Sequence, residues 1–228
     1  MANMRTLIIG FGHIGKALSE VLVDYKPVCI ERNEVEGTFD IMHICFGYNE
    51  NFISEVKRYQ EKYKPKFTVI HSTTPVGTCR QLNAVHSPVV GIHPHLAKSI
   101  KTFKKFLSGE QASEVADYFR RAGCNVYLFD KQETTELLKL SQTTFYSMTI
   151  EYTKMLKRIC DEKGLSFSEI YTIPVIDYNR GYEELGYPEI KIPNLVPIMT
   201  GQGGHCTIPN CDLWTNDFTE FIKAQNKK

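Results

Sequence analysis

A glycine-rich segment near the start of the chain has the residue types and spacing that suit a dinucleotide phosphate. The pattern G-x-G-x-x-G is filled by Gly10-Phe11-Gly12-His13-Ile14-Gly15. In that pattern the first glycine permits a tight turn, the second lets the backbone approach a pyrophosphate, and the third allows a helix to pack closely on a strand. We therefore predict that these six residues bind the phosphates of a dinucleotide at the N-terminus of a helix.

An acidic residue follows at the distance that such a site uses. Glu31 lies 21 residues after Gly10, at the end of the apolar run Val28–Ile30. A carboxylate in this place accepts hydrogen bonds from the ribose hydroxyls of NAD and repels the extra phosphate of NADP. The neighbouring Arg32 offers that phosphate a partner. NAD is the predicted cofactor and NADP the alternative, while a glycine turn that binds nothing is the competing interpretation.

The hydrophobic pattern supplies the sheet and helices that such a turn needs. Strands are predicted at residues 5–9, 28–30, 41–46, 67–71, 85–91 and 124–129, and helices after residue 12 and at 52–63 and 111–122. Strands that alternate with helices predict βαβ units. The expected fold class is α/β, with a Rossmann-type doubly wound parallel sheet in a nucleotide-binding domain over residues 1–130.

The pattern changes near residue 130. Residues 132–163 contain neither Gly nor Pro, and Gly164 is placed to end a helix. One long helix is expected there, with a kinked pair of helices as the alternative. Its apolar residues are spread around the helix, so a second copy of the chain is expected to cover part of it as a homodimer. We predict a small all-α domain over 131–228, with further helices at 167–172 and 212–224 and a Pro- and Gly-rich stretch at 173–204.

Composition excludes several classes of protein. The 228 residues carry a formal net charge of +1, which lacks the basic footprint of nucleic-acid binding. The 42% hydrophobic and 23% charged contents are typical of a globular domain. No apolar run approaches the ~18 residues that span a bilayer, and no export signal is recognised. The seven cysteines are therefore expected to be reduced thiols in a cytoplasmic protein that acts on a small molecule.

Three further segments resemble one enzyme family. They are Ser72-Thr73-Thr74-Pro75-Val76-Gly77-Thr78, Thr135-Glu136-Leu137-Leu138-Lys139-Leu140 and Gly201-Gln202-Gly203-Gly204-His205-Cys206-Thr207-Ile208-Pro209. They resemble the S-T-x-P-V-G-T turn, the A-E-x-x-K-L helix opening and the G-x-G-G-H-C-I-P loop of the UDP-glucose/GDP-mannose (nucleotide-sugar) dehydrogenases. This family lies within the wider 6-phosphogluconate and prephenate dehydrogenase superfamily. The chain is expected to be a short form without the family's C-terminal nucleotide-binding domain.

The resemblance implies roles for particular residues. In the family an alcohol is oxidised by NAD to an aldehyde, which a loop cysteine attacks, and a second oxidation gives a thioester that water hydrolyses. Cys206 matches the cysteine, and its competing interpretation is a small buried apolar residue. Lys139 matches a lysine that stabilises oxyanions, and Thr73 a threonine thought to position water. Glu136 lies on the same helical face as Lys139 and is expected to orient its ammonium group. Ser72 and Thr73 are also assigned to the cofactor site.

The departures from the family pattern keep two other functions open. Thr143 replaces an asparagine, and Asn210 replaces an aspartate, so this position has no carboxylate base. Both glutamates of the family's S-P-E-x-x-x-E segment are missing, and residues 87–96 instead resemble the G-x-H-P motif of prephenate dehydrogenases. The first alternative is a single oxidation of a prephenate-like or small hydroxy-acid substrate with His93 or His95 as base. The second is a non-catalytic dinucleotide-binding protein. No metal is predicted, because the Cys and His spacing fits no zinc motif.

Overall fold

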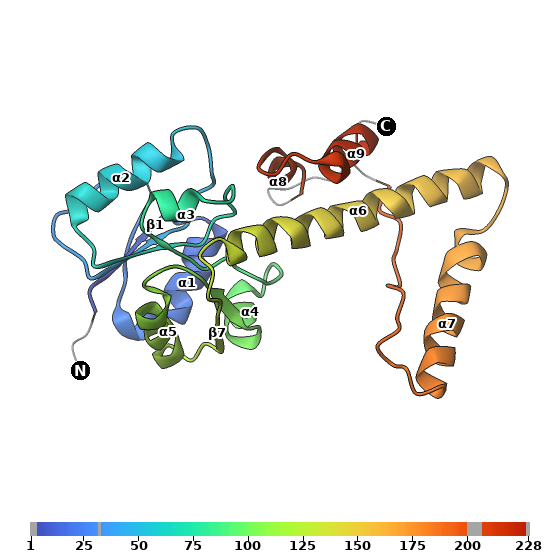
Figure 1. The fold of residues 1–228 in the computed structure, drawn as a ribbon, viewed down its shortest axis with the longest axis horizontal. Helices are drawn as coiled ribbons and strands as arrows, with labels where there is room; N and C mark the ends of the chain where they lie inside the picture. Colours follow the sequence, from blue (N-terminus) through green and yellow to red (C-terminus); the bar gives the residue numbers. More distant parts are fainter. Residues whose placement is uncertain (1–3, 32, 200–206, 227–228) are drawn as a thin grey trace. The chain divides into compact units, whose positions relative to one another are not determined.

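The structure is a computed structural model that describes residues 4–31, 33–199 and 207–226. Its backbone divides into two compact units, Met1–Leu140 and Ser141–Lys228. The first unit alternates strands and helices, and the second is built from helices (Figure 1). The division lies within one helix, ten residues after the domain boundary expected from the sequence.

The first unit is built on a five-stranded parallel sheet. Its strands are β1 (Thr6–Ile9), β2 (Val28–Ile30), β3 (Ile41–Ile44), β4 (Phe67–Ile70) and β5 (Val85–His86), in the order β2-β1-β3-β4-β5. Two further strands, β6 (Lys105–Leu107) and β7 (Val126–Leu128), pair in parallel, and a bridge from His86 to Ser108 links this pair to β5. The Rossmann-type α/β fold predicted from the alternating pattern is therefore confirmed.

Helices cover both faces of this sheet. One face packs against α1 (His13–Val21), α4 (Leu96–Thr102) and α5 (Ala112–Arg121). The other face packs against α2 (Phe52–Tyr63) and the short α3 (Thr78–Gln81). A single 3₁₀ turn, Val23–Tyr25, follows α1. Each core contains β-branched and aromatic side chains from the strands, such as Ile8 on the first face and Ile9 on the second, because neighbouring residues of a strand point to opposite faces.

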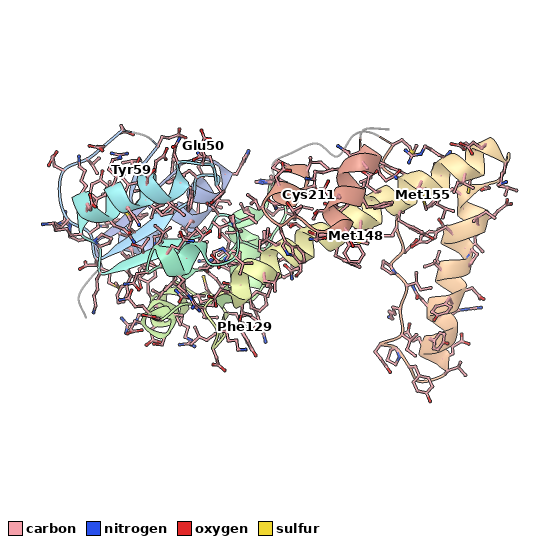
Figure 2. The ribbon with its side chains drawn as sticks, turned by 45° about the horizontal axis from the view of Figure 1, so that its top comes forward. Glu50, Tyr59, Phe129, Met148, Met155 and Cys211 are labelled. Carbon is pink, nitrogen blue, oxygen red and sulfur yellow. The ribbon has the colours of Figure 1, made fainter. Side chains whose placement is uncertain are left out.

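The second unit contains most of one long helix. α6 (Thr134–Glu162) is a single α-helix of 29 residues, so the alternative of a kinked pair is not what the structure has. A π-helical turn, Ser168–Thr172, leads directly into α7 (Ile173–Glu184), and α8 (Ile208–Asp212) and α9 (Asp217–Asn226) follow. Figure 2 labels Met148 and Met155 on α6 and Cys211 on α8.

The sequence did not predict α7, and it placed one helix where the structure has α8 and α9. The Pro- and Gly-rich composition of residues 173–204, which include Pro174 and Gly181, predicts no helix in this stretch. Pro174 lies in the first turn of α7, where its missing N–H leaves no hydrogen bond unmade and its fixed φ suits a helix. Arg158 of α6 donates a hydrogen bond to Gln225 of α9, and the two atoms are 3.5 Å apart.

Apolar side chains are exposed along the helices of the second unit. On α6 they include Phe145, which is 62% exposed, and Tyr146, which is 57% exposed. On α7 they include Ile173 at 58% and Ile176 at 53%. None of the helices in the described part of the chain combines the length and apolar character needed to cross a membrane.

Candidate active site

The glycine turn joins β1 to α1, and each glycine meets a different steric condition. Gly10 has a φ of +92°, and a Cβ placed on it would lie 2.7 Å from the backbone N of Phe46. A Cβ on Gly15 would lie 2.1 Å from the carbonyl O of Gly10, so α1 can pack here only without a side chain. A Cβ on Gly12 would meet no atom within 4 Å. The open side of Gly12 is the space that a pyrophosphate occupies in this pattern.

The same turn lies at the carboxyl edge of the sheet, where ligands of doubly wound folds bind. The backbone N–H of Gly10 donates to the carbonyl of Ile30, the last residue of β2, over 2.9 Å. This bond places Glu31 directly beside the turn, and the Glu31 side chain is exposed. Glu31 is thus available to the ribose of a dinucleotide. Arg32 lies outside the described residues.

The segment after β4 is held in place by buried hydrogen bonds. Ser72 is buried, and its hydroxyl donates to the carbonyl of Phe46, just after β3. Thr73 follows and is half-buried. The carboxylate of Glu136, at the start of α6, accepts hydrogen bonds from Thr74 and from the backbone of this turn. Glu136 therefore has a partner that the sequence did not predict, in addition to its place on the Lys139 face.

Lys139 points to the segment that follows β5. Its Nζ donates to the carbonyl O of Val89 over 2.9 Å. Val89 and Lys139 both lie in the first unit, as does the turn that carries Thr73. The first unit thus brings the Lys139 ammonium group and the Ser72–Cys79 turn to the edge of the sheet that also carries the glycine turn.

His93 meets the glycine turn from the loop after β5. Its ring lies 4.5 Å from the ring of His13, measured between centroids, and the two rings are at 65° to one another. Both side chains are exposed. His13 is the first residue of α1, so this contact brings a titratable group from the G-x-H-P segment to the candidate cofactor site. Phe11 lies beside α1, with the Lys16 ammonium 5.9 Å from its ring centroid.

A buried histidine pair behind the site was not predicted. His43 of β3 and His71, which follows β4, are joined by a hydrogen bond of 3.0 Å between Nδ1 and Nε2. His71 Nδ1 lies 2.8 Å from the carbonyl of Ser87, which can only accept, so Nδ1 carries the proton. Burial, aided by the charge of Lys105, lowers the pKa of His43 to about 3 and that of His71 well below 6.5. The only sequence signal for His43 is a histidine within an apolar strand.

The remaining predicted residues lie in the second unit or outside the described residues. Cys206 belongs to the segment 200–206, which is outside the described part of the chain. Asn210, which replaces the family's aspartate, is buried on α8, and Thr143 is half-buried on α6. Cys211 is buried, and burial raises the pKa of its thiol. Among the described residues no three or more Cys, His, Asp or Glu side chains are grouped as a metal site would require.

The chain is similar to curated nucleotide-sugar dehydrogenases over part of its length. It is 25% identical over 167 residues to an NDP-N-acetyl-D-galactosaminuronic acid dehydrogenase of Ralstonia solanacearum, and equally to one of Ralstonia nicotianae. Each match covers 60% of this chain and 36% of the relative, so the chain spans about a third of the length of the curated relatives it matches. No family model matches the chain.

Solved structures of dehydrogenases share the fold. A UDP-D-ManNAc dehydrogenase from Pyrococcus horikoshii superposes with a TM-score of 0.76 at 17% identity, over 98% of this chain and 68% of that one. The 3-hydroxyisobutyrate dehydrogenase of Mycobacterium tuberculosis superposes with a TM-score of 0.67 at 12% identity, over 98% of this chain and 92% of that one. The resemblance inferred from the motifs is thereby confirmed as a similarity: part of this chain is similar in sequence to nucleotide-sugar dehydrogenases, and its fold is shared with 3-hydroxyisobutyrate dehydrogenase.

Proposed function

We propose that this chain is an NAD-dependent dehydrogenase that oxidises an alcohol group of a sugar-like or nucleotide-sugar-like substrate. The observation that carries this proposal is the glycine turn, whose open side at Gly12 would accept a pyrophosphate beside the exposed Glu31. The named activities of the relatives support the same class of reaction. NADP is the alternative cofactor, and one structural neighbour, named Psf3, is a complex with NADP+.

The residues that would hold the cofactor fit its chemistry. Backbone N–H groups at the start of α1 would bind the phosphates, and the Glu31 carboxylate would accept hydrogen bonds from the ribose. Ser72 and Thr73 follow β4, which β3 separates from β1, and they complete this side of the site. When bound, the nicotinamide accepts the hydride that leaves the substrate carbon.

Three side chains would carry the rest of the reaction. The Lys139 ammonium would stabilise negative charge on the substrate oxygen. Counted from Ser87, the S-P-E-x-x-x-E pattern puts His93 at the place of the second glutamate, so His93 would take the hydroxyl proton. In a two-step route the Cys206 thiolate would attack the aldehyde carbon and form a thiohemiacetal. Loss of a hydride to a second NAD would turn it into a thioester, which water would hydrolyse.

The contact between His93 and His13 favours a second candidate function. A base at the glycine turn is sufficient for one oxidation of a prephenate-like or small hydroxy-acid substrate, without Cys206. The ratio of NADH formed to substrate consumed separates the two routes. A ratio of two supports the thioester route, and a ratio of one supports the single oxidation.

Cys206→Ser is the matched test of the thioester route. The variant is expected to bind NAD as the natural chain does and to lose its second oxidation, because a serine hydroxyl is a far weaker nucleophile than a thiolate. Cys29→Ser is the control, since Cys29 is a half-buried thiol on β2. Undiminished turnover in Cys206→Ser would remove Cys206 from the mechanism.

If no turnover occurs with any nucleotide sugar or hydroxy acid while NAD still binds, the chain is the non-catalytic dinucleotide-binding protein.

We also propose that the chain acts as a homodimer formed through the α6 region. The exposed apolar side chains of α6 and α7 support this proposal, because large apolar side chains that stay exposed in one chain can be covered by a second subunit.

A further inference from the structure

The carboxylate of Glu136 is buried and receives three hydrogen bonds from one turn. Its Oε2 accepts from the backbone N–H of Gly77 over 2.7 Å, and its Oε1 accepts from the backbone N–H of Cys79 over 2.9 Å. The Thr74 hydroxyl also donates to Oε1, over 3.2 Å. Glu136 has no exposed surface. Two backbone donors and one hydroxyl therefore fix this side chain to the segment that carries Thr73.

The residue before Glu136 makes a second connection through His86. His86 Nε2 lies 3.0 Å from the carbonyl of Ser72, which can only accept, so Nε2 carries the proton. His86 Nδ1 is then the acceptor for the Thr135 hydroxyl, which lies 2.8 Å away. Both side chains are fully buried. His86 thus joins the start of the Ser72–Cys79 turn to the first turn of α6.

These two connections fix the position of Lys139 along α6. Thr135 and Glu136 are consecutive residues in the first turn of the helix, and Lys139 lies one turn further on. A helix turn is rigid, so a shift of Glu136 along the helix axis carries Lys139 with it. Because the same two residues bind the turn that contains Thr73, the spacing between Lys139 and Thr73 is set by buried hydrogen bonds.

We propose that Glu136, Thr135 and His86 are positioning residues that hold Lys139 in register with the Ser72–Cys79 turn, and that Glu136 is not itself an acid or base in the reaction. The proposal rests on the proposed function only for the role of Lys139. The three hydrogen bonds that the Glu136 carboxylate accepts all come from the turn, so both of its oxygens are held there. Burial and the negative charge of Glu136 raise the pKa of the Cys79 thiol well above its ordinary value.

The test compares Glu136→Gln and Thr135→Val with the control Glu133→Gln. An amide has only one acceptor oxygen, so Glu136→Gln leaves one backbone N–H of the turn without a partner. Thr135→Val keeps the side-chain shape and removes the hydroxyl that His86 accepts from, which provides a milder variant if Glu136→Gln does not fold. Glu133 is the neighbouring acid on the same segment and pairs with Arg80, with 30% of its side chain exposed.

Two readouts need neither substrate nor cofactor. The first is hydrogen exchange at the Gly77 and Cys79 amides, which is expected to accelerate on the order of tenfold or more in Glu136→Gln, since a lost hydrogen bond of ~1.4 kcal/mol corresponds to a factor of 10. The second is the rate at which a lysine-acylating reagent labels Lys139, measured by mass spectrometry. Labelling of Lys139 is expected to change several-fold in both test variants and to stay constant in Glu133→Gln. Unchanged labelling would overturn the proposal, whatever the amides do.

Turnover supplies a third readout that separates positioning from general damage. Displacement of a catalytic group by ~1 Å can cost on the order of 10²-fold in rate. In Glu136→Gln, kcat is expected to fall by about that factor while the KM for NAD is nearly unchanged. A fall in kcat together with a rise in the KM for NAD by a similar factor would overturn the proposal, because it would indicate an unfolded site. Absence of turnover in the natural chain would contradict the proposed function alone, since exchange and labelling would still be measurable.

Discussion

The imidazole ring of His93 lies against that of His13, with 4.5 Å between the ring centroids. The contact joins the loop after β5 to the first residue of α1. His93, which stands where the S-P-E-x-x-x-E pattern has its second glutamate, therefore reaches the glycine turn. We expect His93→Ala to lower kcat by about 10²-fold, the usual effect of removing a general base. Steady-state kinetics with the substrate found by screening measures this change.

His95→Ala is the matched control for that prediction, because His95 is an exposed histidine two residues further along the same segment. It is expected to retain turnover. Equal rates for His93→Ala and the natural chain would show that His93 takes no proton in the reaction. Equal losses in both histidine variants would assign the effect to the loop instead.

Stability is expected to fall on acidification because three histidines are buried in the neutral form. Burial lowers the pKa of His43 to about 3 and that of His86 to about 4, and it lowers that of His71 as well. The unfolded chain takes up these protons near pH 6.5, whereas the folded chain does not. The free energy of unfolding should therefore be highest above about pH 6.5 and decrease towards pH 4, by up to about 1.4 kcal/mol per pH unit for each histidine.

Urea unfolding at several pH values between 4 and 7.5 measures that slope. The variant His86→Gln removes one of the three groups and should show a shallower dependence, whereas His95→Gln, at an exposed position, should keep the slope of the natural chain. A free energy of unfolding that does not change below pH 6.5 would show that these histidines are not buried in the neutral form.

Gly15→Ala is expected to destabilise the first unit. The new Cβ would lie 2.1 Å from the carbonyl O of Gly10. This clash is with backbone and not with a flexible side chain, so it can be relieved only if α1 moves away from β1. Overpacking of a tight site usually costs about 1–3 kcal/mol. Thermal or urea unfolding measures the loss. Gly181→Ala on α7 is the control, because a Cβ on Gly181 would meet no atom within 4 Å. A stability equal to that of the natural chain would mean that α1 packs differently.

Phe145→Glu is expected to shift the chain from dimer to monomer. Phe145 is 62% exposed on α6, within the apolar surface that we assign to the homodimer. A charge placed inside a subunit interface is costly because it must lose its water. Light scattering coupled to gel filtration measures the molar mass. Val23→Glu is the control, since Val23 is 61% exposed but lies in the first unit. A natural chain that is monomeric at all concentrations would contradict the homodimer.

The sequence predicted most of the first unit because its signals are local. The period of the apolar residues gave α2 with its observed bounds, and the glycine spacing located the turn before α1. The partners of Glu136 lie 57 to 62 residues away in the chain, and no spacing within the helix indicates them. The position of His93 also depends on the fold, because the loop after β5 meets the start of α1 only once the sheet has formed.

The failures of prediction have a different cause. The Pro- and Gly-rich composition of residues 173–204 predicts no helix, although a proline in the first turn, such as Pro174, is compatible with one, so α7 was missed. The pair His43 and His71 was missed because the sequence around a histidine in a strand does not indicate which distant residue will form the hydrogen bond that makes its burial possible. The proposed roles of Cys206 and Arg32 rest on the sequence, because both residues lie outside the described part of the chain.

The central claim is that a dinucleotide binds at the glycine turn, and Gly12→Val tests it most directly by calorimetric titration with NAD. A Cβ at Gly12 would meet no atom of the protein within 4 Å, so the variant should keep the melting temperature of the natural chain. The valine would fill the space assigned to the pyrophosphate, and the account predicts that the natural chain binds NAD and that the variant loses at least about tenfold in affinity, a change of ~1.4 kcal/mol. Equal binding by both proteins, or no binding of NAD or NADP by the natural chain, would contradict the account.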